Sequence, residues 1–361
     1  MRSPADYSIA PDIAVASTLP GRFYADAAAY AVARERLFAR SWQWLGDLRD
    51  VAEPESLAPR DLLPGLLDEP LLLARDAAGT LRCLSNVCTH RGNLLVRAPC
   101  RMAQIRCGYH ARRFDLSGRM TFMPEFGDAR DFPSARDDLP QVPLATWGDF
   151  GFAALDPMAP LDAALDAIAA RIGFVPGRGD VHDPARDRDF AIDAHWALYV
   201  ENYLEGFHIP HVHRALAGTV DYAGYRDELF RHGTVQIAPA RDGEPAFEQR
   251  EEGARIAAYY AWLFPNLMLN VYPWGLSVNL VLPQGLSRTR VLFRSYVRDR
   301  SMLDRGAGGA LDAVEHEDEA IVEAVQRGVR ARLYARGRYS PTRERGVHHF
   351  HRLLCEFLGR D

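Results

Sequence analysis

The sequence contains no lysine, so its 43 basic residues are all arginines. They are outweighed by 48 acidic residues, which gives a formal net charge of −5, and no block of consecutive basic residues occurs. A nucleic-acid-binding protein usually carries such a block or a basic face, so nucleic acid is not an expected partner. With 48% hydrophobic and 25% charged residues, the composition is that of an ordinary globular protein.

Long hydrophobic runs are also missing. No apolar stretch approaches the roughly 20 residues that a membrane-spanning helix needs, so no membrane association is expected. The N-terminal segment MRSPADYSIAPDIAVAST has no continuous apolar core of the kind found in signal peptides. Together these absences favour a cytoplasmic location.

Cysteine is scarce, with five residues in 361. An odd number in a long chain argues against a disulfide framework and for a reducing compartment. Cys83, Cys100 and Cys355 are expected to be small buried residues, since free cysteine is among the most buried residue types. The other two thiols remain available as metal ligands.

The length of the chain suggests two domains. Residues 23–44 have a helical pattern, whereas residues 45–155 consist of short apolar runs separated by Gly, Pro and Asp, which is typical of antiparallel strands. Strand texture returns at about 255–300, and a long helix is predicted at about 308–334. Strands and helices without regular βαβ alternation predict an α+β fold.

Residues 88–110, CTHRGNLLVRAPCRMAQIRCGYH, contain two short metal-ligand motifs. Cys88 and His90 form a Cys-x-His, and Cys107 and His110 form a Cys-x-x-His. Zinc accepts two thiolates and two imidazoles, but in zinc fingers the two cysteines usually form one short motif and the two histidines another. One residue of each kind on each loop suits a two-iron cluster whose thiolates hold one iron and whose imidazoles hold the other. Both interpretations remain open on spacing alone.

A second group of possible ligands lies in residues 201–213, ENYLEGFHIPHVH. Asn202, Glu205 and His208 recur every three residues, and His211 and His213 follow closely. The surrounding residues 190–209 are predicted to form a helix that Asp193 caps and Pro210 ends. Two histidines and one carboxylate on one side of an iron leave open positions for O₂ and substrate.

The carboxylate for this second group is Glu205 or a residue elsewhere. In the predicted C-terminal helix, Asp318 falls in the middle of an apolar stripe, where an acid must be paired, hydrogen-bonded or bound to metal. Glu317 lies at the edge of the stripe. Acids predicted on the solvated side are Glu315, Glu319 and Glu323; the stripe itself comprises Val314, Ile321, Val322, Val325 and Val329. A salt bridge from Asp318 to an arginine is the structural alternative.

The two groups together resemble the catalytic alpha subunit of Rieske non-heme iron oxygenases, the ring-hydroxylating family, over nearly the whole chain. The first group matches the Rieske motif that binds a [2Fe-2S] cluster, with Ala111 where the family commonly has glycine. The resemblance implies a small all-β Rieske domain at 45–155 and a helix-grip catalytic domain at 156–361, in which a sheet wraps around a long C-terminal helix. Residues 1–44 are expected to pack with the catalytic domain.

The family pattern Asp/Glu-x-x-His-x₄-His matches Glu205, His208 and His213. By this resemblance His208, His213 and Asp318 bind a mononuclear Fe(II), and His211 is not a ligand. Glu205 is implied to link an iron-binding histidine to a cluster histidine of the neighbouring subunit, where most members have aspartate. Asn202 is expected beside this centre.

The resemblance further implies O₂ as cosubstrate, a homotrimeric ring, and a separate NAD(P)H-dependent reductase with or without a ferredoxin. The segment YYAWLFPNLMLNVYPWG looks like the choline monooxygenase branch, which acts on small quaternary amines. Aromatic side chains could face such a cation through cation–π contacts, and the candidates are Tyr259, Tyr260, Trp262, Tyr272 and Trp274. Three alternatives stay open: the rings fill the core, the substrate is aromatic, or the protein is a non-enzymatic electron carrier or zinc-stabilised binding protein.

Overall fold

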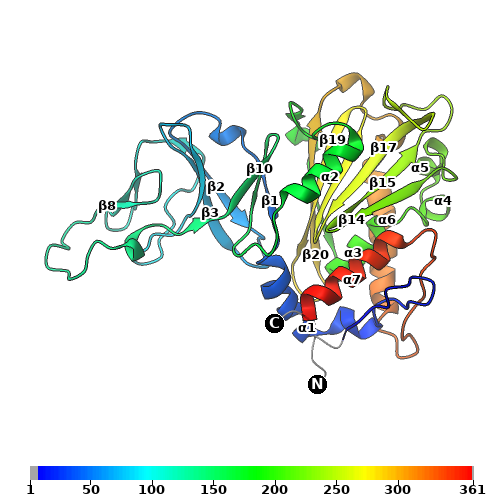
Figure 1. Cartoon of the computed structure of the whole chain (residues 1–361), viewed down its shortest axis with the longest axis horizontal. Helices are drawn as coiled ribbons and strands as arrows, with labels where there is room; N and C mark the ends of the chain where they lie inside the picture. Colours follow the sequence, from blue (N-terminus) through cyan, green and yellow to red (C-terminus); the bar gives the residue numbers. More distant parts are fainter. Residues whose placement is uncertain (1–6, 360–361) are drawn as a thin grey trace. The chain divides into compact units, whose positions relative to one another are not determined.

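The structure, a computed structural model, describes residues 7–359. It forms two compact units (Figure 1). The smaller unit comprises residues 39–159. The larger unit contains the chain from Pro160 onward together with the segment up to Phe38. The N-terminal segment therefore belongs to the larger unit.

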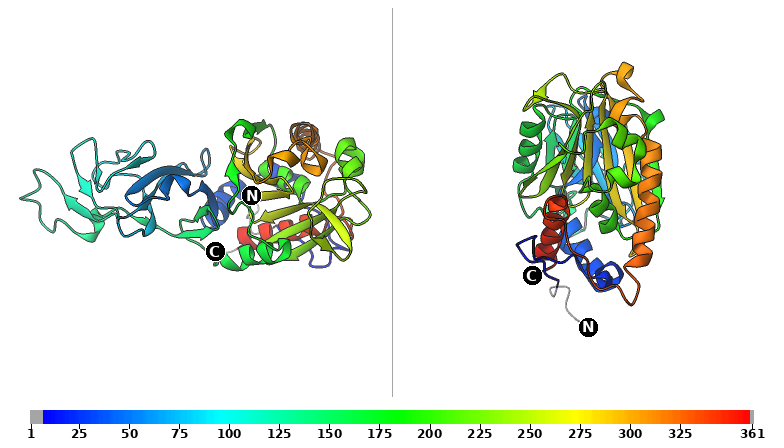
Figure 2. Two further views of the ribbon diagram at one scale, coloured as in Figure 1. Left: turned by 90° about the horizontal axis from the view of Figure 1, so that it is seen from above. Right: turned by 90° about the vertical axis from the view of Figure 1, so that its right-hand side faces the viewer.

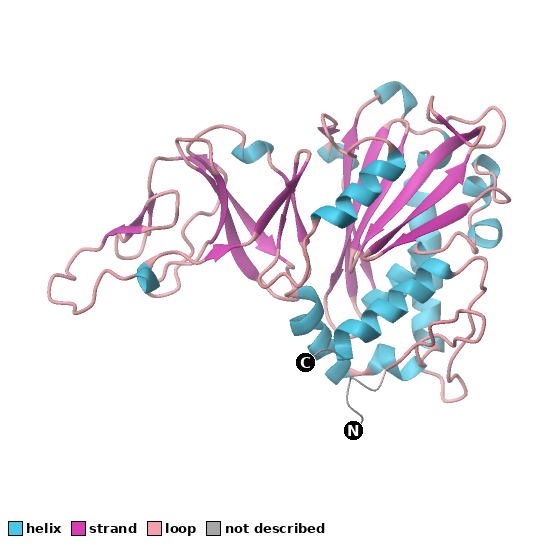
Figure 3. Ribbon diagram, viewed as in Figure 1, coloured by secondary structure: helices cyan, strands magenta, loops and turns pink. Residues whose placement is uncertain are grey.

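The smaller unit consists of antiparallel strands and long loops, with only two short 3₁₀ turns (Figure 3). Its three sheets have the strand orders β5-β2-β3-β4-β9, β1-β11-β10 and β6-β7-β8. The strands are β1 (Gln43–Asp47), β2 (Ser56–Leu62), β3 (Glu69–Arg75), β4 (Leu81–Ser85), β5 (Cys100–Arg101), β6 (Ile105–Arg106), β7 (Arg113–Phe114), β8 (Met120–Phe122), β9 (Gln141–Val142), β10 (Leu144–Trp147) and β11 (Phe150–Ala153), and the turns are η4 (Arg49–Val51) and η5 (Ala135–Asp137).

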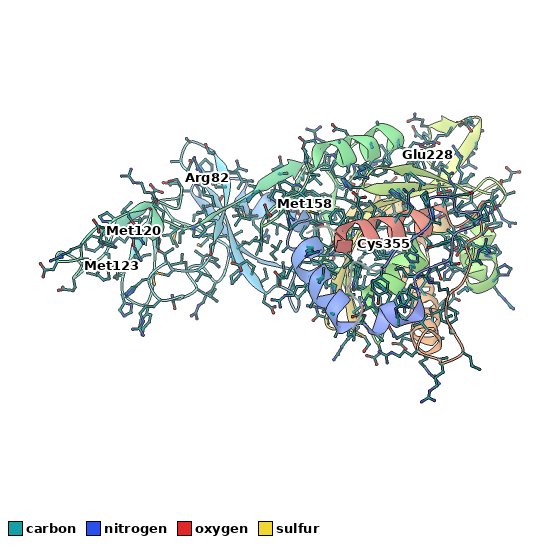
Figure 4. The ribbon with its side chains drawn as sticks, turned by 60° about the horizontal axis from the view of Figure 1, so that its bottom comes forward. Arg82, Met120, Met123, Met158, Glu228 and Cys355 are labelled. Carbon is teal, nitrogen blue, oxygen red and sulfur yellow. The ribbon has the colours of Figure 1, made fainter. Side chains whose placement is uncertain are left out.

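One hydrophobic core of this unit extends from the sheet to the ligand-bearing loops. Leu57, Leu72 and Leu84 from neighbouring strands are fully buried and form a cluster with Cys88 and Cys107. Met120 belongs to the same cluster, and Met123 packs against it (Figure 4). Close packing against this core holds the two candidate ligand thiols in place and restricts the movement of their loops.

The larger unit is built on one antiparallel sheet of nine strands. Seven of them follow the order β12-β20-β19-β18-β17-β15-β14, and the other two lie off this path, where β13 pairs with β20 and β16 pairs with β17. The strands are β12 (Val181–His182), β13 (Arg188–Ile192), β14 (Arg226–Phe230), β15 (Gly233–Pro239), β16 (Arg250–Glu251), β17 (Ala254–Leu263), β18 (Leu267–Tyr272), β19 (Gly275–Pro283) and β20 (Thr289–Val297). The α+β prediction and the helix-grip architecture are confirmed.

Helices cover both faces of this sheet, and Figure 2 shows α2 and α6 on opposite sides. α2 contacts β15 and β17, while α3 contacts β19 and α6. The helices are α1 (Ala27–Ala33), α2 (Asp162–Ile172), α3 (Trp196–Tyr203), α4 (Ile209–Val212), α5 (Arg214–Thr219), α6 (Leu311–Gly328) and α7 (Arg345–Gly359), with a π-helical turn η3 (Arg34–Phe38) and 3₁₀ turns η2 (Gly21–Ala25), η6 (Pro184–Arg186), η7 (Arg300–Met302) and η8 (Gly306–Gly308).

The register aligns a row of polar side chains across the face that α3 covers. Tyr260 pairs with Gln236 and Asn270, Asn270 pairs with Ser277, and Ser277 pairs with Ser295. Directly opposed residues share one face of a sheet. A sheet face packed under helices is normally apolar, so this polar row indicates a lined cavity.

The predicted helix at 190–209 is wrong in its boundaries. Residues 188–192 form strand β13, and α3 begins only at Trp196, where the Nδ1 atom of His195 accepts a hydrogen bond from the amide of Ala197. Asp193 caps nothing; its own amide donates to Glu323. Pro210 occupies the first turn of α4 instead of ending a helix, a position that tolerates proline because no amide donor is needed there.

The predicted solvated and buried faces of the C-terminal helix are also partly wrong. Glu315 is buried at 4% exposure, whereas Ile321 and Val325 are exposed at 41% and 42%. The inward face of α6 carries polar groups with partners: Gln326 accepts a hydrogen bond from the amide of His195, for example. Tertiary hydrogen bonds thus override the apolar periodicity.

Candidate metal centres and active site

The two loops that carry the first ligand group have the same hydrogen-bond pattern. The amide of Cys88 donates to the carbonyl of Asn93, and the amide of Gly92 donates back to Cys88. In the second loop Cys107 donates to Arg112, and Ala111 donates back to Cys107. Gly92 and Ala111 both have positive φ, 70° and 60°. Ala111 therefore adopts the left-handed backbone that glycine favours, and the loop keeps its shape despite the substitution.

The four side chains of these loops lie with their donor atoms inward. Cys88 and Cys107 are 2% exposed, and the rings of His90 and His110 are 4.8 Å apart. The Nδ1 atom of each of these histidines is buried and has no hydrogen-bond partner within the described residues. A buried nitrogen without a partner is costly, and a metal bonded there would satisfy it. The residues therefore fit a metal cluster.

Hydrogen bonds prepare one of the two sulfurs for a negative charge. The Sγ atom of Cys107 accepts from the amide of Tyr109 at 3.4 Å and from the Asn93 side chain at 3.7 Å. Burial acts to raise the pKa of Cys107, but hydrogen bonds from the amides of Tyr109 and His110 and from the side chains of Cys88 and Asn93 together lower it. By contrast, burial raises the pKa of Cys83 to about 12, as expected of an inert buried thiol.

The spread of the four donors bears on the choice between zinc and a two-iron cluster. A tetrahedral zinc site draws its ligand atoms within about 4 Å of one another. Across residues 7–359, three or more such side chains converge to single-ion distances only at His208, His213 and Asp318. The first group is not among the sites that meet this single-ion criterion, and the choice between zinc and a two-iron cluster rests on the family comparison below.

A buried ion pair lies directly beside these loops. Arg112 is 2% exposed, and its Nη2 atom donates to Oδ1 of Asp137 at 2.6 Å. The hydroxyl of Thr89 donates to the backbone carbonyl of the same Asp137. Thr89 of the first loop and Arg112, which follows the second loop, thus both hydrogen-bond to Asp137.

The second ligand group is assembled by three helical elements of the larger unit. His208 follows the break after α3, His213 follows α4, and Asp318 lies on α6. Nε2 of His208 is 3.1 Å from Nε2 of His213 and 3.6 Å from Oδ1 of Asp318, and His213 Nε2 and Asp318 Oδ1 are 3.0 Å apart. Three ligands at right angles around an ion, each about 2.1 Å away, would be about 3.0 Å apart. The triangle fits one metal ion bound from a single side.

Each of the two histidines is held from behind by a glutamate. Nδ1 of His208 donates to Oε1 of Glu205 at 2.6 Å, and Nδ1 of His213 donates to Oε2 of Glu317 at 2.7 Å. Carboxylates in this position fix the ring and strengthen it as a ligand. Burial acts to lower the pKa of His213, but Asp318 and Glu317 raise it overall, so the surroundings favour a positive charge at this point.

The remaining predicted residues are placed around the triangle. His211 is exposed and stands apart from the three, while Asn202 and Glu205 line the adjoining cavity. No role for Glu317 follows from the sequence, in which this residue falls at the edge of the apolar stripe. Glu315 was likewise missed, and its position one turn before Asp318 was the available signal.

A cavity lies beside the triangle, and its empty space is about 690 Å³ when the open solvent at its mouth is counted. His208, His213 and Asp318 form part of its wall. The rest is polar and aromatic, and comprises five tyrosines (Tyr199, Tyr203, Tyr225, Tyr260, Tyr272), four carboxamides (Asn202, Gln236, Asn270, Asn279), Phe293, Glu205, Glu315 and five aliphatic residues.

Only two of the five aromatic residues suggested by the sequence line this cavity, Tyr260 and Tyr272. Tyr259 points to the opposite face of the sheet, where its hydroxyl meets Glu251. Trp262 and Trp274 are buried in the core. Alternation along β17 separates Tyr259 from Tyr260. Trp262 is on the same face as Tyr260 but packs against Phe350 of α7, and Trp274 lies in the turn after β18.

Two metal-binding units of this kind, one strand-rich with mixed sulfur and imidazole donors and one a helix-grip fold, define a Rieske-type oxygenase. The family model "Ring hydroxylating alpha subunit (catalytic domain)" matches residues 179–360, and "Rieske [2Fe-2S] domain" matches residues 41–134. The chain belongs to the Rieske non-heme iron oxygenases, as their alpha subunit.

Among its relatives, the chloroplastic choline monooxygenase of Arabidopsis thaliana is 30% identical over 94% of this chain and 82% of the relative. The carnitine monooxygenase oxygenase subunit of Escherichia coli K12 is 29% identical over 94% and 93%. The solved structure of the quaternary ammonium Rieske monooxygenase CntA shares the fold, with a TM-score of 0.80, 23% identity and 99% coverage of both chains. Naphthalene 1,2-dioxygenase from Rhodococcus sp. shares it at a TM-score of 0.72, 19% identity and 95% and 94% coverage.

Membership of the family settles the class of the protein. It is a terminal oxygenase with a [2Fe-2S] cluster, a mononuclear non-heme iron and O₂ as cosubstrate. The zinc-stabilised and carrier interpretations are thereby set aside. None of the helices within residues 7–359 is long and apolar enough to cross a membrane.

Proposed function

We propose that this oxygenase oxidises a small quaternary ammonium compound, by hydroxylation or oxidative demethylation. The observation that carries the proposal is the cavity beside His208, His213 and Asp318, whose wall combines tyrosine rings with acidic side chains and, among residues 7–359, contains no arginine. The relatives named for choline and carnitine support the same class of substrate.

A quaternary ammonium group cannot donate a hydrogen bond, so it must be recognised by charge and by aromatic faces. Tyr203 and Tyr260 lie edge to face at 6.4 Å, and Tyr260 and Tyr272 at 6.1 Å, so rings turn toward the cavity from several directions. An aromatic hydrocarbon is the alternative substrate. A hydrocarbon could form no hydrogen bonds with the four carboxamides and five hydroxyls of the wall. It would also displace water from them, which costs free energy because these groups would lose their hydrogen-bond partners.

In this proposal Cys88, His90, Cys107 and His110 hold the [2Fe-2S] cluster, and His208, His213 and Asp318 hold the mononuclear iron. When bound, the cluster supplies electrons one at a time and the iron activates O₂ beside the substrate. The protein's own residues do the positioning: Glu205 and Glu317 orient the two histidines, and the tyrosine wall holds the substrate and limits access of water. The proposed domains are 45–155 for the cluster and 156–361 for catalysis, with 1–44 packed on the latter.

Glu205 is proposed to have a second role in electron transfer between subunits. Its carboxylate is 14% exposed; Oε1 accepts from Nδ1 of His208, and Oε2 accepts from the amides of Phe207 and His208. A carboxylate oxygen has more than one lone pair, so a donor from outside the chain would share one of these oxygens. A homotrimeric ring would place a neighbour's cluster histidine there. The glutamate side chain reaches one methylene further than the aspartate usual in the family.

The electrons are proposed to come from a separate NAD(P)H-dependent reductase, with or without a ferredoxin, in the cytoplasm. The sequence has no Gly-x-Gly-x-x-Gly motif before a helix with which this chain would bind the nucleotide itself. An electron-transfer partner is therefore needed for repeated turnover.

A substrate panel with the purified holoenzyme and a reductase tests the proposal. Oxygen uptake should rise with choline, carnitine or a related trimethylammonium compound and stay at background with naphthalene. Stimulation by the aromatic compound alone would contradict the assignment.

A further inference from the structure

Glu315 is a buried acid in the active-site cavity that the metal centres do not use. It lies on α6 one turn before Asp318, is 4% exposed and contributes to the cavity wall. The hydroxyl of Tyr199 lies 3.0 Å from its Oε1 atom and 2.8 Å from its Oε2 atom. One neutral hydroxyl is thus the only hydrogen-bond donor found for this carboxyl group among residues 7–359.

Among residues 7–359, no positively charged side chain pairs with this carboxyl group. Throughout the described chain, Glu315 has no ion pair with an arginine or a histidine, and the charged neighbours that act on it are Asp318 and Glu319, both negative. Burial raises the pKa of Glu315 well above its usual range, and these two acids add to the effect. A buried acid with one neutral partner is unfavourable when ionised unless a ligand brings the missing charge.

The other acids of the cavity already have partners. Glu205 accepts from His208, and Asp318 lies 3.0 Å from His213 as part of the metal triangle. Glu315 is the acid of the cavity wall that remains without a positive partner. Its position beside the triangle would hold a cationic group within reach of the oxidising centre.

We propose that Glu315 determines the specificity for a positively charged substrate, because its carboxylate forms the ion pair with the ammonium group, and that Tyr199 positions this carboxylate. The inference rests on the proposed function, since it presupposes a quaternary ammonium substrate. Tyr199 lies on α3 and is 5% exposed, so its hydroxyl is held rigidly toward the acid. The aromatic rings alone would attract the cation more weakly than rings and a carboxylate together.

The test compares two ligands that differ only in charge. Choline and 3,3-dimethylbutan-1-ol have nearly the same shape, with a quaternary nitrogen in the first and a quaternary carbon in the second. Their dissociation constants are measured by anaerobic calorimetry on the holoenzyme, with iron and cluster content checked for each variant. Wild-type protein should prefer choline by at least about tenfold, because a partly buried ion pair is formed with choline alone.

Glu315→Gln keeps the size of the side chain and removes its charge. This variant should lose the preference for choline, while binding of the neutral alcohol changes by less than about twofold. Glu315→Asp and Glu315→Asn form a second pair that differs in charge alone. The aspartate should keep part of the preference and the asparagine none, which keeps the inference testable if the glutamine variant does not fold.

The outcomes separate this inference from the proposed function. A preference for choline that survives in Glu315→Gln or in Glu315→Asn overturns the role of Glu315 and leaves the proposed function intact. Wild-type protein that binds neither choline nor carnitine, and oxidises no quaternary ammonium compound, overturns both.

Discussion

The two metal-binding sites of this protein are constructed in different ways. The residues proposed to hold the cluster come from two loops within 88–110, and both loops have the same hydrogen-bond pattern. The proposed iron ligands are farther apart in the chain: His208 and His213 flank α4, and Asp318 lies on α6, 105 positions after His213. A local site depends on its own loops, whereas a dispersed site depends on how the helices pack. Mutations should therefore affect the two sites independently.

The largest expected effect is the loss of the iron site alone. His213→Ala removes a ligand that is 1% exposed, so the mononuclear iron should be lost and turnover abolished. The cluster lies in the other unit, and the visible absorption should remain. Cys107→Ser is the counterpart and should lose the cluster absorption as well. Full activity of His213→Ala would show that the ligand assignment is wrong.

The next largest effect concerns the connection between the sites. Glu205→Gln should bind both metals, since the amide can still accept a hydrogen bond from His208, but the link to a neighbouring cluster is weakened. Single-turnover oxidation of the reduced cluster should slow by about 10²-fold or more. Normal kinetics together with full metal content would refute the bridging role.

A smaller effect is expected from the glutamate behind His213. Glu317→Gln should weaken iron binding by about tenfold, because the orienting carboxylate is partly exposed, at 46%, and its replacement by a neutral amide weakens the hydrogen bond. Glu319→Gln on the same helix is the matched control, since its partner is the exposed His316. Equal iron affinities in the two variants, measured by chelator competition, would remove Glu317 from the site.

The smallest effect is expected at the cluster. Arg112 brings a buried positive charge close to His90, on which it acts electrostatically. Arg112→Gln should lower the reduction potential by up to about 60 mV, about tenfold in the equilibrium, because the reduced cluster carries more negative charge. Asp137→Asn should shift the potential in the opposite direction. Arg113→Gln at the neighbouring position is the control, and equal shifts in Arg112→Gln and Arg113→Gln would show that the burial of Arg112 has no influence.

The difference between a site built from neighbouring loops and one built from distant segments explains what the sequence could predict. Cys88, His90, Cys107 and His110 are close in sequence, so their spacing alone predicts a site, and the structure adds mainly the reason why Ala111 is tolerated. His208, His213 and Asp318 were expected to meet, and the structure brings them together. This expectation depended on the family pattern, because periodicity alone placed only Asp318 on a buried face.

Errors occurred where side-chain partners come from distant segments. The stripe in the last helix was assigned by apolar residues, but the buried face of α6 contains Glu315, Val322 and Gln326. Glu315 is buried because Tyr199, 116 positions away, reaches it. A hydrophobic pattern cannot register a polar group that is paired across the fold, and such groups concentrate at functional sites.

The most direct test of the account is a single turnover of reduced holoenzyme with choline or carnitine and O₂, without any reductase. Oxidised product, quantified by mass spectrometry, should form in proportion to the reduced cluster present and should be absent in His213→Ala. Cluster oxidation without product from any quaternary ammonium compound, in protein that contains both metals, would contradict it.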